Sequence, residues 1–557
     1  MFGLMQDRPL MISSLIDHAA TFHPETEIVT RTVEGPIHRT NYREVQGRSK
    51  RVANAMRALG VTPGQRVGTL AWNTHRHLKL YYGVSGTGAI LHTVNPRLFP
   101  EQIEYIVNHA EDGVMFFDIG FAALVEQLAP ACPSVRTYVA LTDRAHMPAV
   151  DVPNLLCYEE LIAAQSEDYT WPVFDERTAS SLCYTSGTTG NPKGVLYSHR
   201  STVLHSLMEC APDTFNVNSG MTLLLAVPMF HANAWGMPYS AAMAGAKLVM
   251  PGPKLDGQSL YELLRDEKVT FSQAVPTVWL MQFEFFDKHP EIDTLALGLK
   301  RIGVGGAATP RRMIERFERD FGADFVQGWG MTETSPIGVI GNLLPKHASL
   351  SPDERTTVKM KQGRGVWGVE LKIVDVQGRR LPHDGKAFGH LCVRGPWIAS
   401  GYFKGEGGDV LDPDGYFPTG DVATVDADGY VQLVDRAKDV IKSGGEWISS
   451  IDLENAASGH PAVAEVAVVG IAHPKWQERP LMVIVRRAGV DVTAAELQDF
   501  LAQRVVKWWL PDDIVFVDAL PHTATGKLLK TRLREQFKGY VVGCANVPER
   551  ALPPACA

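Results

Sequence analysis

The chain has 557 residues, of which 45% are hydrophobic and 21% charged, and its formal net charge is −8. This length predicts two or more domains with large cores, and the negative charge argues against a protein that coats nucleic acid. The seven cysteines are scattered and odd in number, without a C-x-x-C pair, so we expect neither a disulfide framework nor a zinc site.

The sequence gives no sign of a targeting or membrane-spanning segment. Residues 1–15 carry Asp7 and Arg8 among apolar residues, which is not typical of a signal peptide. Residues 221–246 contain no Asp, Glu, Lys or Arg, but Pro228, Pro238 and two glycines would break a spanning helix. We therefore expect a cytoplasmic protein without an integral membrane segment.

The first part of the chain alternates between helical and extended patterns. The pattern from Ser13 to Gly60 is helical, with apolar residues at three-to-four spacing before Gly60, and a short buried strand follows at 66–72. The pattern then predicts a helix at 100–109, a strand at 114–117, a helix at 121–128 and a strand at 137–141. Such alternation indicates an α/β fold with parallel strands joined by helices.

A strand at 180–184 leads into residues 184–195, with the sequence YTSGTTGNPKGV. Its glycines allow close approach of backbone to a phosphate, its hydroxyls donate hydrogen bonds, and Lys193 adds a positive charge. Because Lys193 is followed by Gly194 and not by Ser or Thr, the stretch is not a Walker A loop. An ordinary surface loop is the alternative.

The order of residues in this loop resembles the signature of the adenylate-forming enzymes, which activate a carboxylate with ATP. This family includes acyl-CoA synthetases, peptide-synthetase adenylation domains and luciferases. The resemblance implies that ATP is bound by Thr185, Ser186, Gly187, Thr188, Thr189, Gly190 and Lys193.

A buried strand at 222–228 leads into residues 229–236, which match the family motif beside the acyl pocket. Amino-acid-activating relatives have an Asp where this chain has His231, which argues against an amino-acid substrate. The resemblance gives His231 a role at the carboxylate, and Trp235 with Gly236 a place in the acyl pocket. The alternative is that His231 and Trp235 are ordinary core residues.

We expect two further buried strands, at 270–280 and 301–308, each ending in small or turn residues. Ligands bind at the carboxyl ends of strands in such sheets. We expect Val304 and Gly305 at the acyl chain, and Gly306 and Ala307 at the adenosine.

Residues 327–336 and 416–423 match later family motifs. They imply that Trp329 stacks on adenine, that the Thr332 hydroxyl meets the α-phosphate, and that Glu333 binds Mg²⁺ together with Thr185. Asp421 is expected to accept the ribose hydroxyls. The motif at 389–396 has His390 where the family usually has Glu, and we interpret it as structural.

After residue 434 the composition shifts to charged residues, so we place a domain boundary there, giving an adenylation domain at 1–434 and a C-terminal domain at 435–557. In the family the C-terminal domain swivels, with Lys438 at the hinge and Arg436 near the ribose and phosphate. Gly444, Gly445 and Trp447 would line the CoA tunnel beside Lys442. Lys527 would be the mobile lysine that bridges carboxylate and α-phosphate.

The fold expected is α/β, with stacked α/β sheets in a large N-terminal domain and a small mobile C-terminal α+β domain.

These parts predict an ATP-dependent acyl-CoA synthetase that uses ATP, Mg²⁺ and CoA and forms an acyl-AMP. The stretches 231–235 and 439–450 resemble bacterial medium- and long-chain fatty acid-CoA ligases, which are commonly homodimers. A nearby branch takes 3-methylthiopropionate, and this short thioether acid remains an alternative substrate. A luciferase-type or carrier-loading enzyme is another alternative, although no carrier attachment site follows Lys527.

Overall fold

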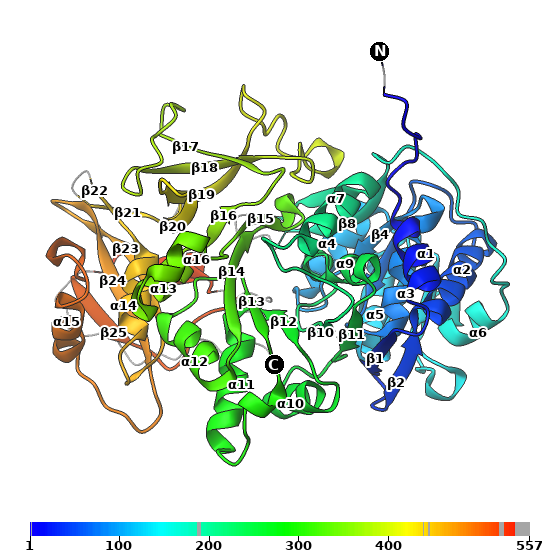
Figure 1. Ribbon diagram of the computed structural model, residues 1–557, viewed down its shortest axis with the longest axis horizontal. Coiled ribbons are helices and arrows are strands. Elements are labelled where there is room, and N and C mark those ends of the chain that lie inside the picture. The colour runs from blue at the N-terminus through cyan, green and yellow to red at the C-terminus, as the bar shows by residue number, and fades with distance from the viewer. Residues whose placement is uncertain (2, 186–190, 438, 444–445, 523–527, 541–557) are drawn as a thin grey trace.

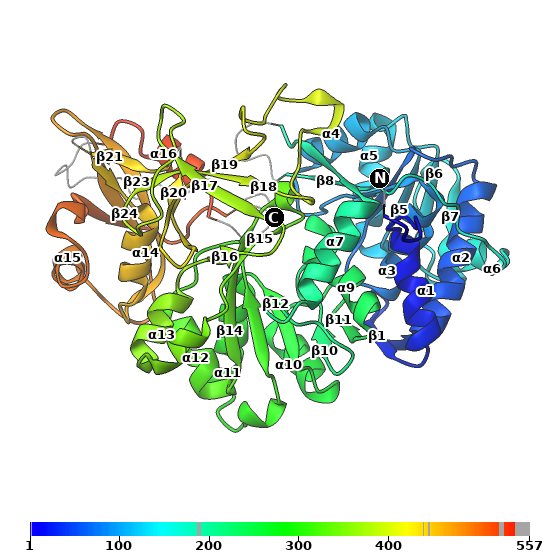
Figure 2. The ribbon, with the colours of Figure 1, turned by 45° about the horizontal axis from the view of Figure 1, so that its top comes forward.

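The computed structural model describes residues 1, 3–185, 191–437, 439–443, 446–522 and 528–540. Over these ranges the strands form three sheets, and Figures 1 and 2 show the third sheet at the end of the molecule opposite the N-terminal helices. In the same ranges, no helix combines the length and the apolar character needed to cross a bilayer. The expected α/β class is confirmed.

The first sheet follows the predicted alternation of helix and strand. The segment from Ser13 to Gly60, expected to be helical, instead holds two strands, Glu27–Arg31 and Ile37–Asn41, between its two helices. Its order is β7-β6-β5-β3-β4-β8-β9, and all neighbours are parallel except β8 and β9. The strands are β3 (Arg66–Leu70), β4 (Ile90–Thr93), β5 (Val114–Phe117), β6 (Thr137–Ala140), β7 (Leu155–Cys157), β8 (Ala179–Tyr184) and β9 (Gly194–Ser198). The helices of this part are α2 (Tyr42–Ala58), α3 (His75–Gly83), α4 (Pro100–Ala110), α5 (Ala122–Leu128) and α6 (Tyr158–Ala163).

The second sheet runs through the middle of the molecule in the order β17-β18-β19-β20-β16-β15-β14-β13-β12-β10-β11-β1-β2. Its parallel part contains β1 (Glu27–Arg31), β10 (Thr222–Leu224), β11 (Lys247–Met250), β12 (Phe271–Ala274), β13 (Arg301–Val304) and β14 (Asp324–Gly330). Antiparallel strands extend it on both sides: β2 (Ile37–Asn41), β15 (Ile337–Ile340), β16 (Gly363–Gly365), β17 (Glu370–Val374), β18 (Phe388–Arg394), β19 (Phe417–Val425) and β20 (Tyr430–Arg436).

Helices cover both faces of the parallel strands. In both views α7 and α9 lie between the strands of the first sheet and those of the second (Figures 1 and 2). The buried side chains of α1, α2, α3, α7 and α9 form one continuous apolar core with strands of both sheets. The helices of this part are α1 (Ile12–Phe22), α7 (His199–Cys210), α8 (Ala232–Trp235), α9 (Met237–Ala244), α10 (Gly257–Asp266), α11 (Pro276–Lys288), α12 (Arg311–Phe321) and α13 (Pro352–Lys359).

Three of the predicted strands end well before expected, and one of them, the segment 301–308, is a strand only to Val304. The segment 270–280 is a strand only to Ala274, because Pro276 occupies the first turn of α11, a position where its missing N–H is not needed. The segment 222–228 is a strand only to Leu224. Beyond it the Asn73 side chain donates to the carbonyls of Leu225 (2.7 Å) and Val227 (2.8 Å), so a side chain replaces a neighbouring strand.

The third sheet is small and C-terminal. Its order is β22-β21-β24-β23, with β25 parallel to β24. The elements are β21 (Ile441–Ser443), β22 (Glu446–Ile448), α14 (Ser450–Ser458), β23 (Val463–His473), β24 (Gln477–Arg486), α15 (Ala494–Ala502), β25 (Asp513–Phe516) and α16 (Lys530–Gln536). The chain passes from the second sheet to the third between Arg436 and Ile441, just beyond the predicted boundary. The Ser449 hydroxyl donates to the Val434 carbonyl at 2.7 Å and joins the two parts.

The cysteines within the described ranges are all free thiols: Cys132, Cys157, Cys183, Cys210 and Cys392.

Candidate nucleotide and acyl site

The phosphate-binding stretch connects β8 to β9, as the sequence predicts. Its base is closed by two reciprocal hydrogen bonds: the Thr185 amide donates to the Lys193 carbonyl at 2.9 Å, and the Lys193 amide donates to Thr185 Oγ1 at 3.0 Å. The two ends of the loop are therefore held together at the edge of the first sheet. Ser186, Gly187, Thr188, Thr189 and Gly190 lie outside the described residues.

Tyr402 connects Lys193 to Glu333, although they are far apart in the sequence. The Lys193 ammonium lies 4.7 Å from the centre of the Tyr402 ring, and it makes no ion pair with a carboxylate of the described ranges. The Tyr402 hydroxyl donates to Glu333 Oε1 at 2.6 Å. Burial and the Glu333 charge raise the pKa of Tyr402, so this hydroxyl stays protonated as a donor.

Glu333 sits in the short 3-10 turn η6 (Thr332–Thr334), directly after β14. Its side chain is buried, its carbonyl accepts the Ala399 amide at 2.8 Å, and the Thr332 carbonyl accepts the Tyr197 hydroxyl at 2.7 Å. The turn is thus fixed from both sides, and one carboxylate oxygen of Glu333 remains for another ligand. Over the described residues no group of three His, Cys, Asp or Glu side chains could hold a metal by itself.

Asp421, Trp329 and Arg436 form one cluster. The Trp329 indole N–H donates to Asp421 Oδ2 at 2.9 Å, and Arg436 Nε lies 2.8 Å from Asp421 Oδ1. Asp421 and Arg436 face each other in the β19–β20 pair. The structure therefore brings together three residues that the sequence assigned to adenosine.

The Trp329 ring itself is 7% exposed. A Cβ added to Gly338 would lie 2.4 Å from Trp329 Cζ3, so the ring packs directly on that glycine. The observed contact of Trp329 is its hydrogen bond to Asp421, and stacking on adenine stays a prediction.

The segment Ala232–Trp235 has a left-handed backbone, with φ values of 41°, 53°, 52° and 55°. A non-glycine residue in this conformation costs about 1–2 kcal/mol. Asn233 holds the turn in place: its Nδ2 donates to Ser181 Oγ at 2.9 Å, and its Oδ1 accepts from the Tyr81 hydroxyl at 3.4 Å. Backbone strain of this kind is typical of ligand sites.

The left-handed turn places Trp235 on the carboxyl end of β13. A Cβ added to Gly305 would lie 3.1 Å from Trp235 Cη2, so the indole rests on this glycine. Val304 is buried beside it, and Gly306 and Ala307 continue from the end of the strand. The predicted acyl-pocket residues Trp235, Val304 and Gly305 are therefore neighbours.

Gly236 follows the turn with φ 85° and lies against two buried side chains of α7. A Cβ at Gly236 would lie 2.7 Å from the His205 ring and 2.9 Å from Glu209 Oε2. Burial lowers the pKa of His205 to about 3, so its ring is neutral near pH 7, and burial raises the pKa of Glu209, which favours its protonated form. His205 Nε2 also accepts the Ile337 amide at 3.2 Å, which connects α7 to the motif at 327–336.

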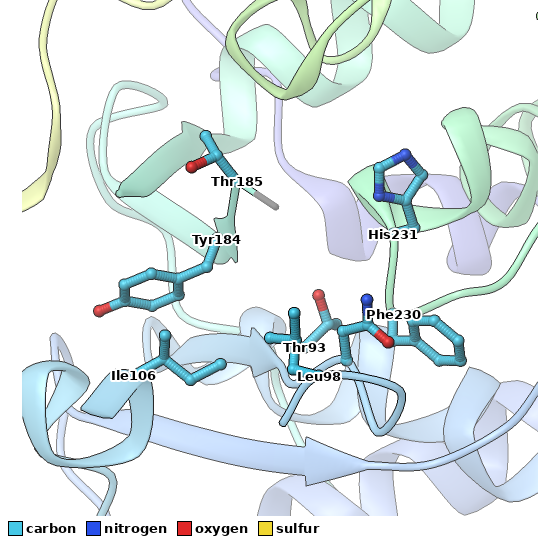
Figure 3. A pocket seen from close by; sticks show the side chains of 8 residues that line it. Thr93, Leu98, Ile106, Tyr184, Thr185, Phe230 and His231 are labelled. Carbon is cyan, nitrogen blue, oxygen red and sulfur yellow. The ribbon is translucent and has the colours of Figure 1, made fainter. Parts of the chain in front are cut away.

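A cavity of about 310 Å³ lies between the phosphate loop and the 229–236 motif (Figure 3). Thr185 and His231 border this cavity from opposite sides. A residue predicted to bind ATP and a residue predicted to bind the carboxylate therefore line the same cavity. The complete lining is Thr93, Asn95, Leu98, Ile106, Tyr184, Thr185, Phe230 and His231.

A second cavity of about 210 Å³ is bordered mainly by apolar residues of β10 and of the segment that follows it. Ala234 and Met237, on either side of Trp235 and Gly236, close it together with Phe271 and Gln273 of β12. It adjoins the acyl-pocket motif, and its character suits a hydrocarbon chain.

The predicted residues of the C-terminal part are described only in part. Lys438, Gly444, Gly445 and Lys527 lie outside the described residues, as does the Trp447 side chain. Lys442 is exposed on β21, where its amide donates to Glu478 Oε2 at 2.9 Å.

The sequence did not point to Asn73, Tyr402 or Gln273. Asn73 and Tyr402 act through contacts with residues distant in the chain, and Gln273 is notable for its place in the lining of the second cavity. None of the three stands in a motif that carries a spacing signal.

Comparison with known proteins also places the chain among the adenylate-forming enzymes, which its sequence motifs resemble. The model of the AMP-binding enzyme family matches residues 16–403, and that of the AMP-binding enzyme C-terminal domain matches residues 452–527. A 3-methylmercaptopropionyl-CoA ligase of Ruegeria lacuscaerulensis is 50% identical over 98% of this chain and 100% of that protein. A medium-chain-fatty-acid–CoA ligase of Ectopseudomonas oleovorans is 47% identical over 96% of this chain and 98% of that protein.

Solved structures show the same fold at lower identity. The anthranilate CoA ligase AuaEII in complex with anthranoyl-AMP aligns with a TM-score of 0.83 and 24% identity, over 96% of this chain and 99% of that one. ATP-bound MatB from Rhodopseudomonas palustris aligns with a TM-score of 0.80 and 23% identity, over 94% and 99%. From its motifs, its fold and its relatives, the chain belongs to the AMP-binding enzyme family of adenylate-forming acyl-CoA ligases.

Proposed function

We propose that this acyl-CoA ligase acts on carboxylic acids with a mainly hydrocarbon tail of medium to long length. The observation that carries this proposal is the apolar lining of the cavity that Ala234 and Met237 close on either side of Trp235 in the chain. As it stands, the cavity has room for only about one water-sized group, so a hydrocarbon tail requires its lining to move apart.

The carboxylate would lie in the cavity between Thr185 and His231. In the first step a carboxylate oxygen attacks the α-phosphorus of ATP, and pyrophosphate leaves as the acyl-AMP forms. Lys193 and the loop hydroxyls would hold the phosphates, and Lys527 would bridge carboxylate and α-phosphate. Such preorganised charges stabilise the negative charge that develops at the phosphorus.

The described residues fit a magnesium ion that arrives with ATP. Glu333 has a carboxylate oxygen left over from its bond with Tyr402, and the described chain supplies no complete metal site, so phosphate oxygens would complete the coordination. Thr185 would stand near the ion. The ion supplies positive charge that offsets the charge of the phosphates.

Asp421 would accept the ribose hydroxyls, and Arg436 would stand at the ribose and phosphate side of the nucleotide. Trp329 supports this role because its N–H orients the Asp421 carboxylate. Gly306 and Ala307 would border the adenosine, and Thr332 would lie at the α-phosphate.

In the second step the CoA thiol attacks the acyl carbonyl, AMP leaves, and the thiol proton passes to solvent or to a nearby base such as His231.

The second step requires a different set of residues. We propose that residues 435–557 swivel on Lys438 relative to residues 1–434, which withdraws Lys527 and brings Lys442, Gly444, Gly445 and Trp447 to the pantetheine arm of CoA. We also propose a cytoplasmic homodimer, as the family resemblance implies.

A short thioether acid is the second candidate, because the Ruegeria relative at 50% identity is named for 3-methylmercaptopropionate. The test is AMP release that depends on ATP, Mg²⁺ and CoA, measured with acetate, butyrate, 3-methylmercaptopropionate, hexanoate, octanoate, laurate and palmitate. We expect the highest kcat/KM at hexanoate to laurate. A maximum at 3-methylmercaptopropionate or butyrate would refute the medium-chain assignment and favour the second candidate.

Trp235→Ala gives an independent test of the tail's position. We expect it to shift the profile of chain lengths and to leave the KM for ATP unchanged. Trp367 is 75% exposed and, unlike Trp235, does not lie against Gly305, so Trp367→Ala provides the control.

A further inference from the structure

Gln273 is a polar side chain in an apolar setting. It lies on β12, is 3% exposed, and borders the 210 Å³ cavity together with leucines, Ala226, Val227, Met237 and Phe271. Neither its amide nitrogen nor its amide oxygen has a hydrogen-bond partner among the described residues. It is the one amide side chain in a lining that is otherwise apolar.

The position of Gln273 connects this cavity to Trp235. Gln273 pairs with Gly303 in the β12–β13 register, and a Cβ added to Gly303 would lie 2.9 Å from Gln273 Cγ. Two residues further along, Gly305 lies beneath Trp235. Gln273 therefore packs over Gly303, and Trp235 packs over Gly305, just beyond the end of β13.

A buried amide without a partner is costly. Leaving such a group unsatisfied costs about 1–3 kcal/mol, and a purely hydrocarbon tail in the cavity would leave both amide atoms unpaired. A tail with one oxygen at the level of Gln273 would remove this penalty, since the amide nitrogen can donate to an ether, keto or hydroxyl oxygen and the amide oxygen can accept from a hydroxyl.

We propose that Gln273 is a specificity-determining residue that selects acids whose tail is mainly hydrocarbon but carries one hydrogen-bonding oxygen. The substrate class is then oxygenated acids of medium length, and unsubstituted fatty acids of the same length bind less well. This inference rests on the proposed position of the acyl tail.

The experiment compares octanoate with analogues of equal length. These are 7-hydroxyheptanoate, in which a hydroxyl replaces the terminal methyl, and the ethers in which oxygen replaces one methylene at each successive position. In the wild-type enzyme we expect at least one analogue to exceed octanoate in kcat/KM by about fivefold or more, the effect of satisfying one buried amide. In Gln273→Leu that preference is lost, and octanoate is used as well as before or better.

Gln282→Leu is the matched control. Gln282 lies on α11, is 1% exposed and also has an unpartnered amide, but it does not border the cavity. Both substitutions replace a buried unpaired amide with an apolar side chain of similar size, a change that is close to neutral for folding. We expect Gln282→Leu to keep the wild-type ratio of analogue to octanoate.

Three outcomes would overturn the inference. They are a wild-type enzyme that prefers octanoate to every analogue, a Gln273→Leu enzyme with the wild-type ratio, and a Gln282→Leu enzyme with the same loss as Gln273→Leu. Each of them leaves the enzyme active and so leaves the proposed function intact. Failure of every acid to release AMP would instead refute the proposed function, and the inference with it.

Discussion

Replacing Gly305 by Ala tests whether the Trp235 indole lies beside the acyl tail. The new Cβ would lie 3.1 Å from Trp235 Cη2, 3.4 Å from Cζ3 and 3.1 Å from the Gly328 carbonyl oxygen. Carbon atoms pack best at about 3.5–4.0 Å, so the indole must retreat by roughly 0.4–0.9 Å. The Gly328 carbonyl belongs to the main chain and cannot move as easily as the Trp235 indole.

The ring has little freedom to retreat. Its backbone belongs to the left-handed turn that Asn233 holds against Ser181, so the displacement must come from the side chain, toward the proposed path of the acyl tail. Overpacking of this size costs about 1–3 kcal/mol. At about 1.4 kcal/mol for each factor of ten, we expect kcat/KM for octanoate to fall by roughly 5- to 150-fold.

The assay is steady-state AMP release with acid varied at saturating ATP and CoA, and then with ATP varied. We expect the KM for ATP to stay within about twofold of the wild type, because Glu333 and Asp421 are untouched. Gly113→Ala is the control, since no atom lies within 4 Å of its added Cβ. Unchanged kcat/KM for octanoate in Gly305→Ala, or an equal rise in the KM for ATP, would refute the reasoning.

Three other substitutions test separate parts of the enzyme. Trp329→Phe keeps a ring on Gly338 but removes the N–H that binds Asp421, so we expect the KM for ATP to rise about tenfold while the KM for the acid is unchanged. Burial raises the pKa of Asp118 from 3.8 to about 7. The folded protein therefore binds more protons than the unfolded chain between these values, and the contribution of Asp118 to stability is lost as pH rises through 7. Compared with the wild type, Asp118→Asn should gain up to about 4 kcal/mol in the free energy of unfolding between pH 4 and pH 7.5, measured by urea denaturation. Lys527→Ala should abolish acyl-AMP formation, measured by pyrophosphate exchange, and leave a supplied acyl-AMP able to react with CoA.

Each of these expectations has an opposing result. An unchanged KM for ATP in Trp329→Phe would mean that Asp421 does not bind the nucleotide or does not need this bond. A stability difference between Asp118→Asn and the wild type that is the same at every pH would contradict a buried protonated carboxyl. Equal loss of both half-reactions in Lys527→Ala would contradict the swivelling mechanism.

The sequence alone determined the class of the fold and the chemistry of the site. The strand at 114–117 and the helix at 100–109 follow from local hydrophobic periodicity, which is visible within one element. The phosphate loop was recognisable because its glycines, hydroxyls and lysine are contiguous. The structure confirms its setting between β8 and β9, and the roles of its residues remain predictions.

Only the tertiary structure decided where some elements end and how the site is assembled. β10 stops at Leu224 because Asn73, about 150 residues earlier, takes the carbonyls that a continuing strand would offer. The hydrogen bond from Trp329 to Asp421 also joins residues distant in the chain. In the same way, the tertiary structure leaves the Gln273 amide without a hydrogen-bond partner among the described residues. Hydrogen-bond partners depend on which distant residues the sheets bring together, and no local pattern in a sequence records that choice.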